Sequence, residues 1–402
     1  MNFTHPLSHR WVPVLMLLIY CAAILNTELY VPAITLMARD LGVSTAKIQA
    51  LVGHTILVQG LSSLFFGPLS DRLGRRPVMV AGLGLMLVGS GVSLWPSYEA
   101  LLLGRLIQGI SAGAIFGLSM ALLADVFTPP QAARAMAYIS MAIVLSPAVG
   151  QLGGGYLAAH YGWHSCLEAA AGMSVAVSSI IYVFMPETLN IEKRLKSSPA
   201  NVLRELRGIL TTKGGAILIF VHPLFFFGFW VFRTVTPVTF VDYFDISVEA
   251  YGYYTALVVL AQLGGAWYVQ NALKQRTLDH LLRQVMQIGM VAVAALCLSL
   301  AAGERYLPLA LTVAGAIFSG AMTMSFSTSV NRAMPFFKAS AGAASGVIGC
   351  VRTIFATGGT YLAAVLTHTH VSFLVAAMVV VCLMALYAIR RGLQVPIPYR
   401  VS

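Results

Sequence analysis

An acidic residue inside a long apolar segment is the feature of this sequence that most directly suggests chemistry. Glu28 lies in the apolar run 11–37 and is the one acid placed squarely within a predicted membrane span. A carboxylate in hydrocarbon is costly and usually functional, and an apolar setting lets it hold a proton near neutral pH. We therefore expect Glu28 to carry a proton. The alternative is an acid neutralised permanently by a neighbour such as Arg105 or by hydrogen bonds.

Two arginines in the second half of the chain also fall within apolar runs. Arg233 follows an aromatic stripe that contains Phe226 and Trp230, and Arg352 lies nearer the middle of its run. The C-terminal spans contain no acid to neutralise these arginines, so a carboxylate or phosphate on a substrate is one candidate partner. The alternative is structural, with Arg233 reaching interfacial water or Asp242. The aromatic residues line a cavity together with Tyr30, or they pack against lipid and neighbouring helices; the sequence leaves both open.

A third candidate site is the turn GPLSDRLGRRP at residues 67–77, which separates two apolar runs. Gly67 and Gly74, with two prolines, predict a helix end and a sharp turn. Arg72, Arg75 and a third arginine place this loop on the cytoplasmic side. Asp71, the acid among them, is expected to pair with these arginines or with the amino end of another helix.

The segments that must position these residues are transmembrane helices. The chain has 402 residues, of which 58% are hydrophobic and only 10% charged, whereas soluble domains have about 25% charged residues. A helical span needs roughly 20 apolar residues. Twelve runs meet this need: 11–37, 45–66, 78–96, 99–124, 135–159, 165–185, 214–237, 250–270, 284–302, 307–328, 341–366 and 371–389. The sequence therefore predicts an all-α polytopic membrane protein with twelve transmembrane helices in two six-helix halves.

The distribution of charge explains the net charge of +11 without nucleic acid. Most lysines and arginines fall in alternate loops and in the terminal segments, which places those regions and both termini in the cytoplasm. We expect an N-terminal six-helix half at 1–185, a cytoplasmic linker at 186–213, a C-terminal six-helix half at 214–390 and a cytoplasmic tail at 391–402. The first apolar run is read as a retained helix rather than a cleaved signal peptide. The five cysteines are scattered without metal-type spacing, so no metal site is expected.

Four motifs resemble those of the major facilitator superfamily. The turn at 67–77 is similar to the signature loop between its second and third helices, and R-x-x-Q-G at 105–109 is similar to its fourth-helix motif. The segment T-E-L-Y-V-P-A-I at 27–34 resembles the first-helix motif of drug:proton antiporters, and S-P-A-V-G-Q-L-G-G-G at 146–155 resembles their fifth-helix motif. In the last, Ser146 replaces the usual first glycine. Together these resemble the Bcr/CflA drug-resistance branch most.

The resemblance implies roles for particular residues. Glu28 and Arg105 would couple protons, and Gln108 would face the substrate cavity. Asp125 would pair with Arg72 or Arg75 to close a cytoplasmic latch, unless it is a solvated loop acid. The fifth-helix residues carried over are Pro147, Gly150, Gly153 and Gly154. Independently of the resemblance, glycines at 109, 113 and 117 predict a small-residue ridge that allows close approach of another helix.

The sequence thus predicts a proton-coupled, alternating-access efflux antiporter for drug-like or amphipathic organic compounds. The alternative is a dedicated exporter or importer of an anionic metabolite such as a carboxylate siderophore. We expect partners limited to a small-molecule substrate, protons and the lipid bilayer, with no nucleic acid and no cofactor, in a monomer of a bacterial-type inner membrane. No nucleophile and base are arranged for catalysis, so an enzyme is not expected.

Overall fold

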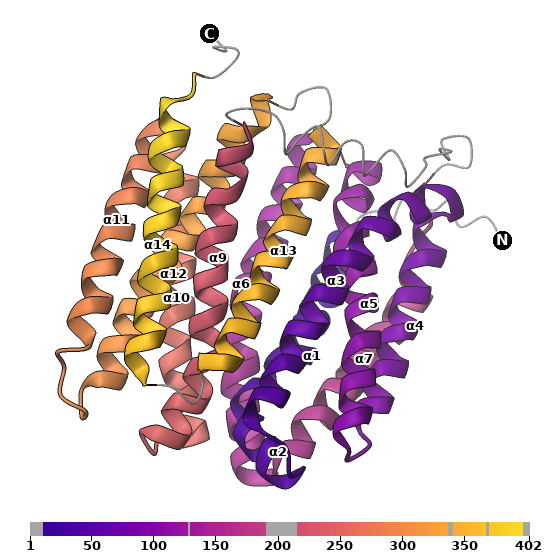
Figure 1. The fold of residues 1–402 in the computed structure, drawn as a ribbon. Coiled ribbons are helices and arrows are strands. Elements are labelled where there is room, and N and C mark those ends of the chain that lie inside the picture. The colour runs from indigo at the N-terminus through magenta and orange to yellow at the C-terminus, as the bar shows by residue number, and fades with distance from the viewer. Residues whose placement is uncertain (1–10, 128, 190–214, 337–340, 367–369, 397–402) are drawn as a thin grey trace. The chain divides into compact units, whose positions relative to one another are not determined.

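The computed structural model describes residues 11–127, 129–189, 215–336, 341–366 and 370–396. Twelve helices of 17 residues or more occur in this part of the chain, and they fall into two compact units, residues 1–201 and 202–402 (Figure 1). The boundary between the units lies within the predicted linker. Residues 190–213 of that linker and 397–402 of the predicted tail lie outside the described residues.

The first unit contains six long helices and one short one, and the long helices have apolar residues in or against a shared core. They are α1 (Val12–Glu28), α2 (Ile34–Asp40), α3 (Thr45–Leu73), α4 (Arg75–Ser93), α5 (Tyr98–Val126), α6 (Pro129–Tyr161) and α7 (Trp163–Phe184). A 3-10 turn, η2 (Val31–Ala33), joins α1 to α2.

The second unit repeats the order of six long helices around a core of its own. They are α9 (Gly215–Val238), α10 (Val248–Ala272), α11 (Leu278–Ser299), α12 (Leu307–Ala333), α13 (Ala341–Leu366) and α14 (Val371–Gln394). A π-helical turn, η4 (Thr239–Tyr243), follows α9.

The helices agree closely with the twelve apolar runs. In the described chain, ten segments are long and apolar enough to cross a membrane. Of the other two long helices, α6 spans the predicted run 135–159, and α10 matches the predicted run 250–270 but falls short of that hydropathy. Polar residues account for the lower hydropathy of α10, which contains Glu249 and Gln262.

Glycine controls how closely the helices of the first unit approach. A Cβ added at Gly109, Gly113 or Gly117 of α5 would lie 2.7, 2.9 or 3.0 Å from the main-chain oxygen of a residue in α3. These short distances confirm the predicted small-residue ridge, because only a residue without a side chain permits this contact. In the second unit, Gly265 of α10 approaches Gly320 of α12 in the same way, with 2.8 Å from the added Cβ to the Gly320 oxygen.

The first apolar run was expected to form one continuous helix, but the structure shows a break in it. α1 ends at Glu28, and the chain passes through η2 before α2 begins. Pro32 explains the break, because it has no N–H to bond the carbonyl of Glu28 four residues earlier and its ring crowds that carbonyl. The acid therefore lies at the end of a helix inside a span, next to a 3-10 turn.

Candidate functional site

Glu28 is buried, with 4% of its surface exposed. One of its partners is Gln151 of α6, whose Nε2 donates a hydrogen bond of 3.1 Å to Oε2 of the acid. The amide oxygen of Gln151, Oε1, has no hydrogen-bond partner within the described chain. The acid is thus held in the helix bundle by a neutral amide with an unused acceptor.

The predicted fifth-helix motif lies directly against Glu28. A Cβ at Gly150 would collide with the Cβ of Glu28 and lie 3.1 Å from Leu25 Cδ2. A Cβ at Gly154 would lie 2.7 Å from the carbonyl carbon of Leu29. Gly153 differs, because its nearest neighbour is Leu29 Cδ2 at 3.8 Å, an ordinary contact. Gly150 and Gly154 therefore bring α6 against the end of α1, whereas Pro147 lies within a helix that continues past it.

Arg105 of α5 is buried beside the same break. Its Nη1 donates to the main-chain oxygen of Asn26 and to Oε1 of Gln108, both at 2.8 Å. Its guanidinium carbon lies 3.9 Å from the ring centroid of Tyr30. Nε and Nη2 of Arg105 and the hydroxyl of Tyr30 are buried without a hydrogen-bond partner among the described residues. This arrangement presents unused donors inside the unit.

Gln108 is engaged in a buried polar network that connects four helices. Its Nε2 donates to Oδ1 of Asn26 at 2.9 Å and to the hydroxyl of Ser90 at 3.1 Å. Asn26 in turn donates to the hydroxyl of Ser174 at 2.6 Å. With its amide used in this way, Gln108 orients Arg105, and contact with a substrate stays a prediction. Asn26, Ser90 and Ser174 were not predicted to belong to a site, although each is a polar residue within an apolar run.

The predicted latch is organised around Arg75. Its Nη1 pairs with Oδ1 of Asp71 at 2.6 Å and donates to the hydroxyl of Ser70 at 2.5 Å, while its Nε pairs with Oδ2 of Asp125 at 2.9 Å. Arg75 is buried, but Arg72 is exposed. Of the two arginines considered as partners of Asp125, the structure therefore identifies Arg75.

Helix boundaries at the latch differ from those expected. α3 continues through Gly67 and Pro68 to Leu73, so Gly67 ends no helix, and a Cβ there would meet nothing within 4 Å. A proline interrupts only its own hydrogen bond and crowds one carbonyl, which a long packed helix can tolerate. The turn is at Gly74, whose φ of 105° is a conformation that favours glycine.

Glu187, just beyond α7, is a latch residue that sequence analysis missed. Its carboxylate accepts hydrogen bonds from the main-chain N–H of Arg75 at 2.9 Å and of Arg76 at 3.3 Å. These are donors at the amino end of α4 that no helical carbonyl can satisfy. Thr188 donates to Asp125 at 3.3 Å. The first residues of the predicted linker are thus bound to the latch. Ser340, which the resemblance places near Asp71, lies outside the described residues.

The second unit contains an arginine cluster at the corresponding place in its helix order. Arg332, near the end of α12, pairs through Nη1 with Oδ1 of Asp279 in the first turn of α11 at 2.7 Å. Its Nη2 donates to the carbonyl oxygens of Gly392 at 3.3 Å and Val395 at 3.3 Å, at the end of α14. Arg332 was read from the sequence only as a basic loop residue, because its burial depends on helices distant in the chain.

Arg352 of α13 lies against aromatic rings within the second unit. Its guanidinium carbon is 5.3 Å from the ring centroid of Phe226 in α9 and 5.7 Å from that of Phe326 in α12. Both rings also pack on His222, whose Nδ1 lies 3.2 Å from the carbonyl of Met322. The structure therefore brings Phe226 and Arg352 together and adds Phe326 and His222, which sequence analysis had not connected with them.

Arg233 forms a neighbouring group. Its guanidinium carbon lies 4.9 Å from the ring centroid of Trp230 and 6.0 Å from that of Phe229. The rings of Trp230 and Phe226 are 6.0 Å apart, edge to face, so both arginines border one aromatic surface. Phe225, by contrast, is buried in the core of the unit, and Phe229 is buried there as well as lying beside Arg233. The aromatic stripe therefore contains both packing residues and residues that contact an arginine.

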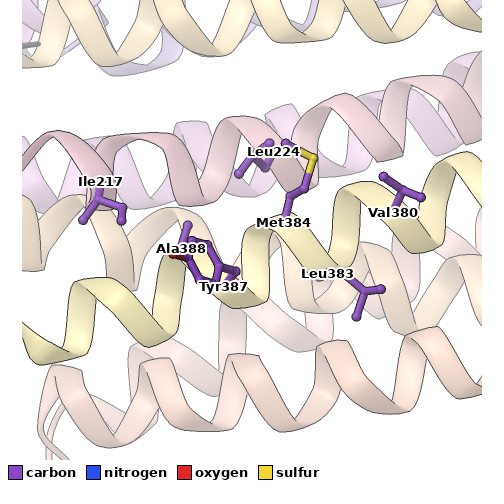
Figure 2. A pocket seen from close by; sticks show the side chains of 7 residues that line it. All are labelled: Ile217, Leu224, Val380, Leu383, Met384, Tyr387 and Ala388. Carbon is purple, nitrogen blue, oxygen red and sulfur yellow. The ribbon is translucent and has the colours of Figure 1, made fainter.

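An apolar groove in the second unit is separate from these sites. It has a volume of about 500 Å³ and lies between α9 and α14, as Figure 2 shows. Its lining residues are Ile217, Leu224, Val380, Leu383, Met384, Tyr387 and Ala388. None of these side chains is charged, so the groove offers no ionic anchor for a ligand. No group of three or more potential metal ligands occurs in the described chain.

Two units of six long helices, with an acid and arginines buried inside them, define a polytopic membrane transporter. The sequence matches the profile of the Major Facilitator Superfamily over residues 16–360. The chain belongs to this superfamily of transporters. It is 25% identical over 371 residues to a bicyclomycin resistance protein homolog of Haemophilus influenzae, covering 90% of this chain and 92% of that protein. It is 31% identical over 186 residues to multidrug resistance protein D of Escherichia coli, covering 46% of this chain and 47% of that one.

Solved structures support the same fold. The human organic anion transporter MFSD10 aligns with a TM-score of 0.69 at 22% identity, covering 97% of this chain and 100% of that one. A bacterial homolog of the human lysosomal transporter Spinster, in an inward-facing state, aligns with a TM-score of 0.70 at 12% identity, covering 97% of this chain and 98% of that one. The predicted family and fold class are confirmed.

Proposed function

We propose that this transporter is a proton-coupled efflux antiporter of drug-like or amphipathic organic compounds. The observation that carries the proposal is Glu28, a buried acid at a break in a membrane-spanning segment, with the neutral side chain of Gln151 as a partner. Burial disfavours the charged form of an acid, and the amide of Gln151 can hydrogen-bond to either form of the carboxyl group. Glu28 is therefore suited to exchange a proton.

In the proposed cycle, Glu28 takes up a proton from one side of the membrane and releases it to the other. Arg105 favours release, because its positive charge in the same unit favours the ionised acid. Superfamily transporters of this design expose a central site alternately to the two sides by moving one half against the other. The Arg75 cluster would close the cytoplasmic side in one state and open in the other.

The names of the relatives support the substrate class. Bicyclomycin resistance and multidrug resistance proteins are similar to this chain across much of its length. Phe226 and Trp230 offer flat apolar contacts of the kind that organic compounds use. We further propose a monomer in a bacterial inner membrane, with both termini in the cytoplasm, as the distribution of basic residues indicates.

A second candidate, a dedicated carrier of an organic anion, is favoured by Arg352 and Arg233. Both guanidinium groups lie against aromatic rings, and a guanidinium is the side-chain group that binds a carboxylate in a planar, bidentate manner. A neighbouring solved structure is named as an organic anion transporter, although at 22% identity its likeness concerns the fold.

The test uses purified protein in proteoliposomes with an imposed proton gradient. Three probes are compared: a lipophilic cation such as tetraphenylphosphonium, a neutral drug such as chloramphenicol, and a tricarboxylate siderophore. Glu28→Gln is expected to lose gradient-driven transport while still folding and binding substrate. Glu168→Gln, which removes an exposed acid from α7, is the matched control and should behave as wild type. Normal gradient-driven flux in Glu28→Gln would contradict the proposal.

The same assay separates the two substrate classes through Arg352→Gln. Efflux of the cation or the neutral drug that is unchanged in this variant supports the drug antiporter. Transport restricted to the siderophore, and lost in the variant, would instead identify a dedicated anion carrier.

A further inference from the structure

Gln151 has a position that the proposed proton exchange does not by itself explain. It is 3% exposed, lies in α6, and reaches Glu28 across a sequence separation of 123 residues. Its Nε2 donates to the acid, but its Oε1 is buried and has no hydrogen-bond partner in the described residues. A buried polar atom without a partner is costly and suggests that the partner arises in another state.

An amide can serve both forms of a carboxyl group. When Glu28 is ionised it only accepts, and the Nε2 group of Gln151 is the appropriate donor. When Glu28 is protonated its hydroxyl becomes a donor, and the unused Oε1 of Gln151 is the matching acceptor. Rotation of the amide, or a small shift of α6, exchanges one hydrogen bond for the other.

Packing at this point favours transmission of such a shift. Gly150 and Gly154 lie one turn apart on α6 and leave no room between α6 and Glu28, at the end of α1, or Leu29, which follows it. Interfaces this tight have discrete arrangements and do not deform gradually. A change in the Gln151–Glu28 hydrogen bond is therefore expected to move α6 relative to the break in α1.

The other described titratable groups near this contact are few. Arg105 and Tyr30 form their own pair on the side of α5. On the side of α7, the thiol of Cys166 donates to the carbonyl of Gly154 at 3.4 Å. On α1 itself, Cys21 accepts from the hydroxyl of Ser146 at 3.5 Å. Of these groups, only Arg105 carries a fixed charge, and Gln151 is a neutral group that hydrogen-bonds the acid directly.

We propose that Gln151 is a positioning residue for proton coupling, which holds Glu28 in both protonation states and transmits the difference to α6. This inference rests on the proposed function, in which Glu28 carries the proton. It assigns a role to a residue of the S-P-A-V-G-Q-L-G-G-G segment other than its proline and glycines.

The test measures gradient-driven accumulation and gradient-independent substrate exchange in proteoliposomes containing the full chain. Gln151→Met keeps the side-chain size but removes both hydrogen bonds. It is expected to lower accumulation about tenfold or more, with exchange retained, and to shift the midpoint of the pH profile by about one to two pH units. Gln131→Met is the control, because Gln131 lies in the same helix but is exposed.

A double variant that exchanges the acid and the amide, called the transposed pair, provides a second measurement. Glu28→Gln combined with Gln151→Glu keeps one acid and one amide in the same contact, so it is expected to recover accumulation that each single substitution loses. If Glu28→Gln loses accumulation but Gln151→Met keeps it with an unchanged pH profile, the role of Gln151 is refuted while proton coupling stands. If Glu28→Gln keeps accumulation, the proposed function itself fails. Loss of both exchange and accumulation in Gln151→Met, with no recovery in the transposed pair, would mean that Gln151 only maintains the fold.

Discussion

Adjacent glycines in α6 allow the contact beside Glu28 to be measured directly. The perturbation is a single methyl group, added in Gly154→Ala and, as the matched control, in Gly153→Ala. At Gly154 the new Cβ would lie 2.7 Å from the carbonyl carbon and 2.9 Å from the Cα of Leu29. These are main-chain atoms, which cannot move aside as the end of a side chain can. At Gly153 the nearest atom is a side-chain methyl at 3.8 Å.

The magnitude follows from two effects. Replacing glycine by alanine within a helix stabilises it by about 1 kcal/mol, and this gain is common to both positions. Overpacking a tight contact costs about 1–3 kcal/mol and applies only at Gly154. We therefore expect Gly154→Ala to be less stable than Gly153→Ala by about 1–3 kcal/mol, because the shared helix term cancels.

The assay is unfolding of the two purified variants in detergent, followed by tryptophan fluorescence during heating and during titration with a denaturing detergent. Transport should fall in Gly154→Ala as well, since the main chain that must move adjoins Glu28. Equal stability of the two variants, or a more stable Gly154→Ala, would refute the close approach of α1 and α6 at this point.

Two further predictions concern the arginine clusters. Arg75→Gln should lower the free energy of unfolding by about 1.5–3 kcal/mol, because it removes two charge-assisted contacts, whereas Arg72→Gln, at an exposed position, should stay within about 0.5 kcal/mol of wild type. Similar effects of the two substitutions in thermal unfolding would contradict the assignment of Arg75 as the centre of the latch. Asp279→Asn should cost about 1–3 kcal/mol, since it leaves Arg332, 2% exposed, without its acid, although the 45% exposure of Asp279 weakens the pair through solvent screening. Unchanged unfolding of that variant would show that the carbonyl groups at the end of α14 suffice for Arg332.

The positions of the helices could be predicted from the sequence because the bilayer imposes a simple requirement. A span needs an uninterrupted apolar length, so runs such as 307–328 lie within the helices that form. The small-residue ridge of α5 could be predicted as well, since the spacing of four residues between its glycines places them on one face of a helix. The break after Glu28 could also have been predicted, because Pro32 leaves the carbonyl four residues earlier without its helical donor.

The partners of the polar residues could not be predicted in the same way. Gln151 and Glu28 are 123 residues apart, and Glu187 and Arg75 are 112 residues apart. A single sequence shows that such residues are polar within or beside apolar runs, but it does not show which faces of two helices meet. Arg72 and Arg75 illustrate the limit, since their types are identical and only the turn at Gly74 directs one of them towards Asp125.

The two arginine clusters have opposite relations to the dipoles of their helices. Arg75 lies at the amino end of α4 and Asp125 at the carboxyl end of α5, so each charge faces a helix end of its own sign. Asp279 and Arg332 have the reverse arrangement, with the acid at an amino end and the arginine at carboxyl ends, and each is stabilised by about 0.3–1 kcal/mol. The helix dipoles therefore weaken the cluster in the first unit. They strengthen the cluster in the second unit, so the partial charges at helix ends act in opposite directions on the two arginine clusters.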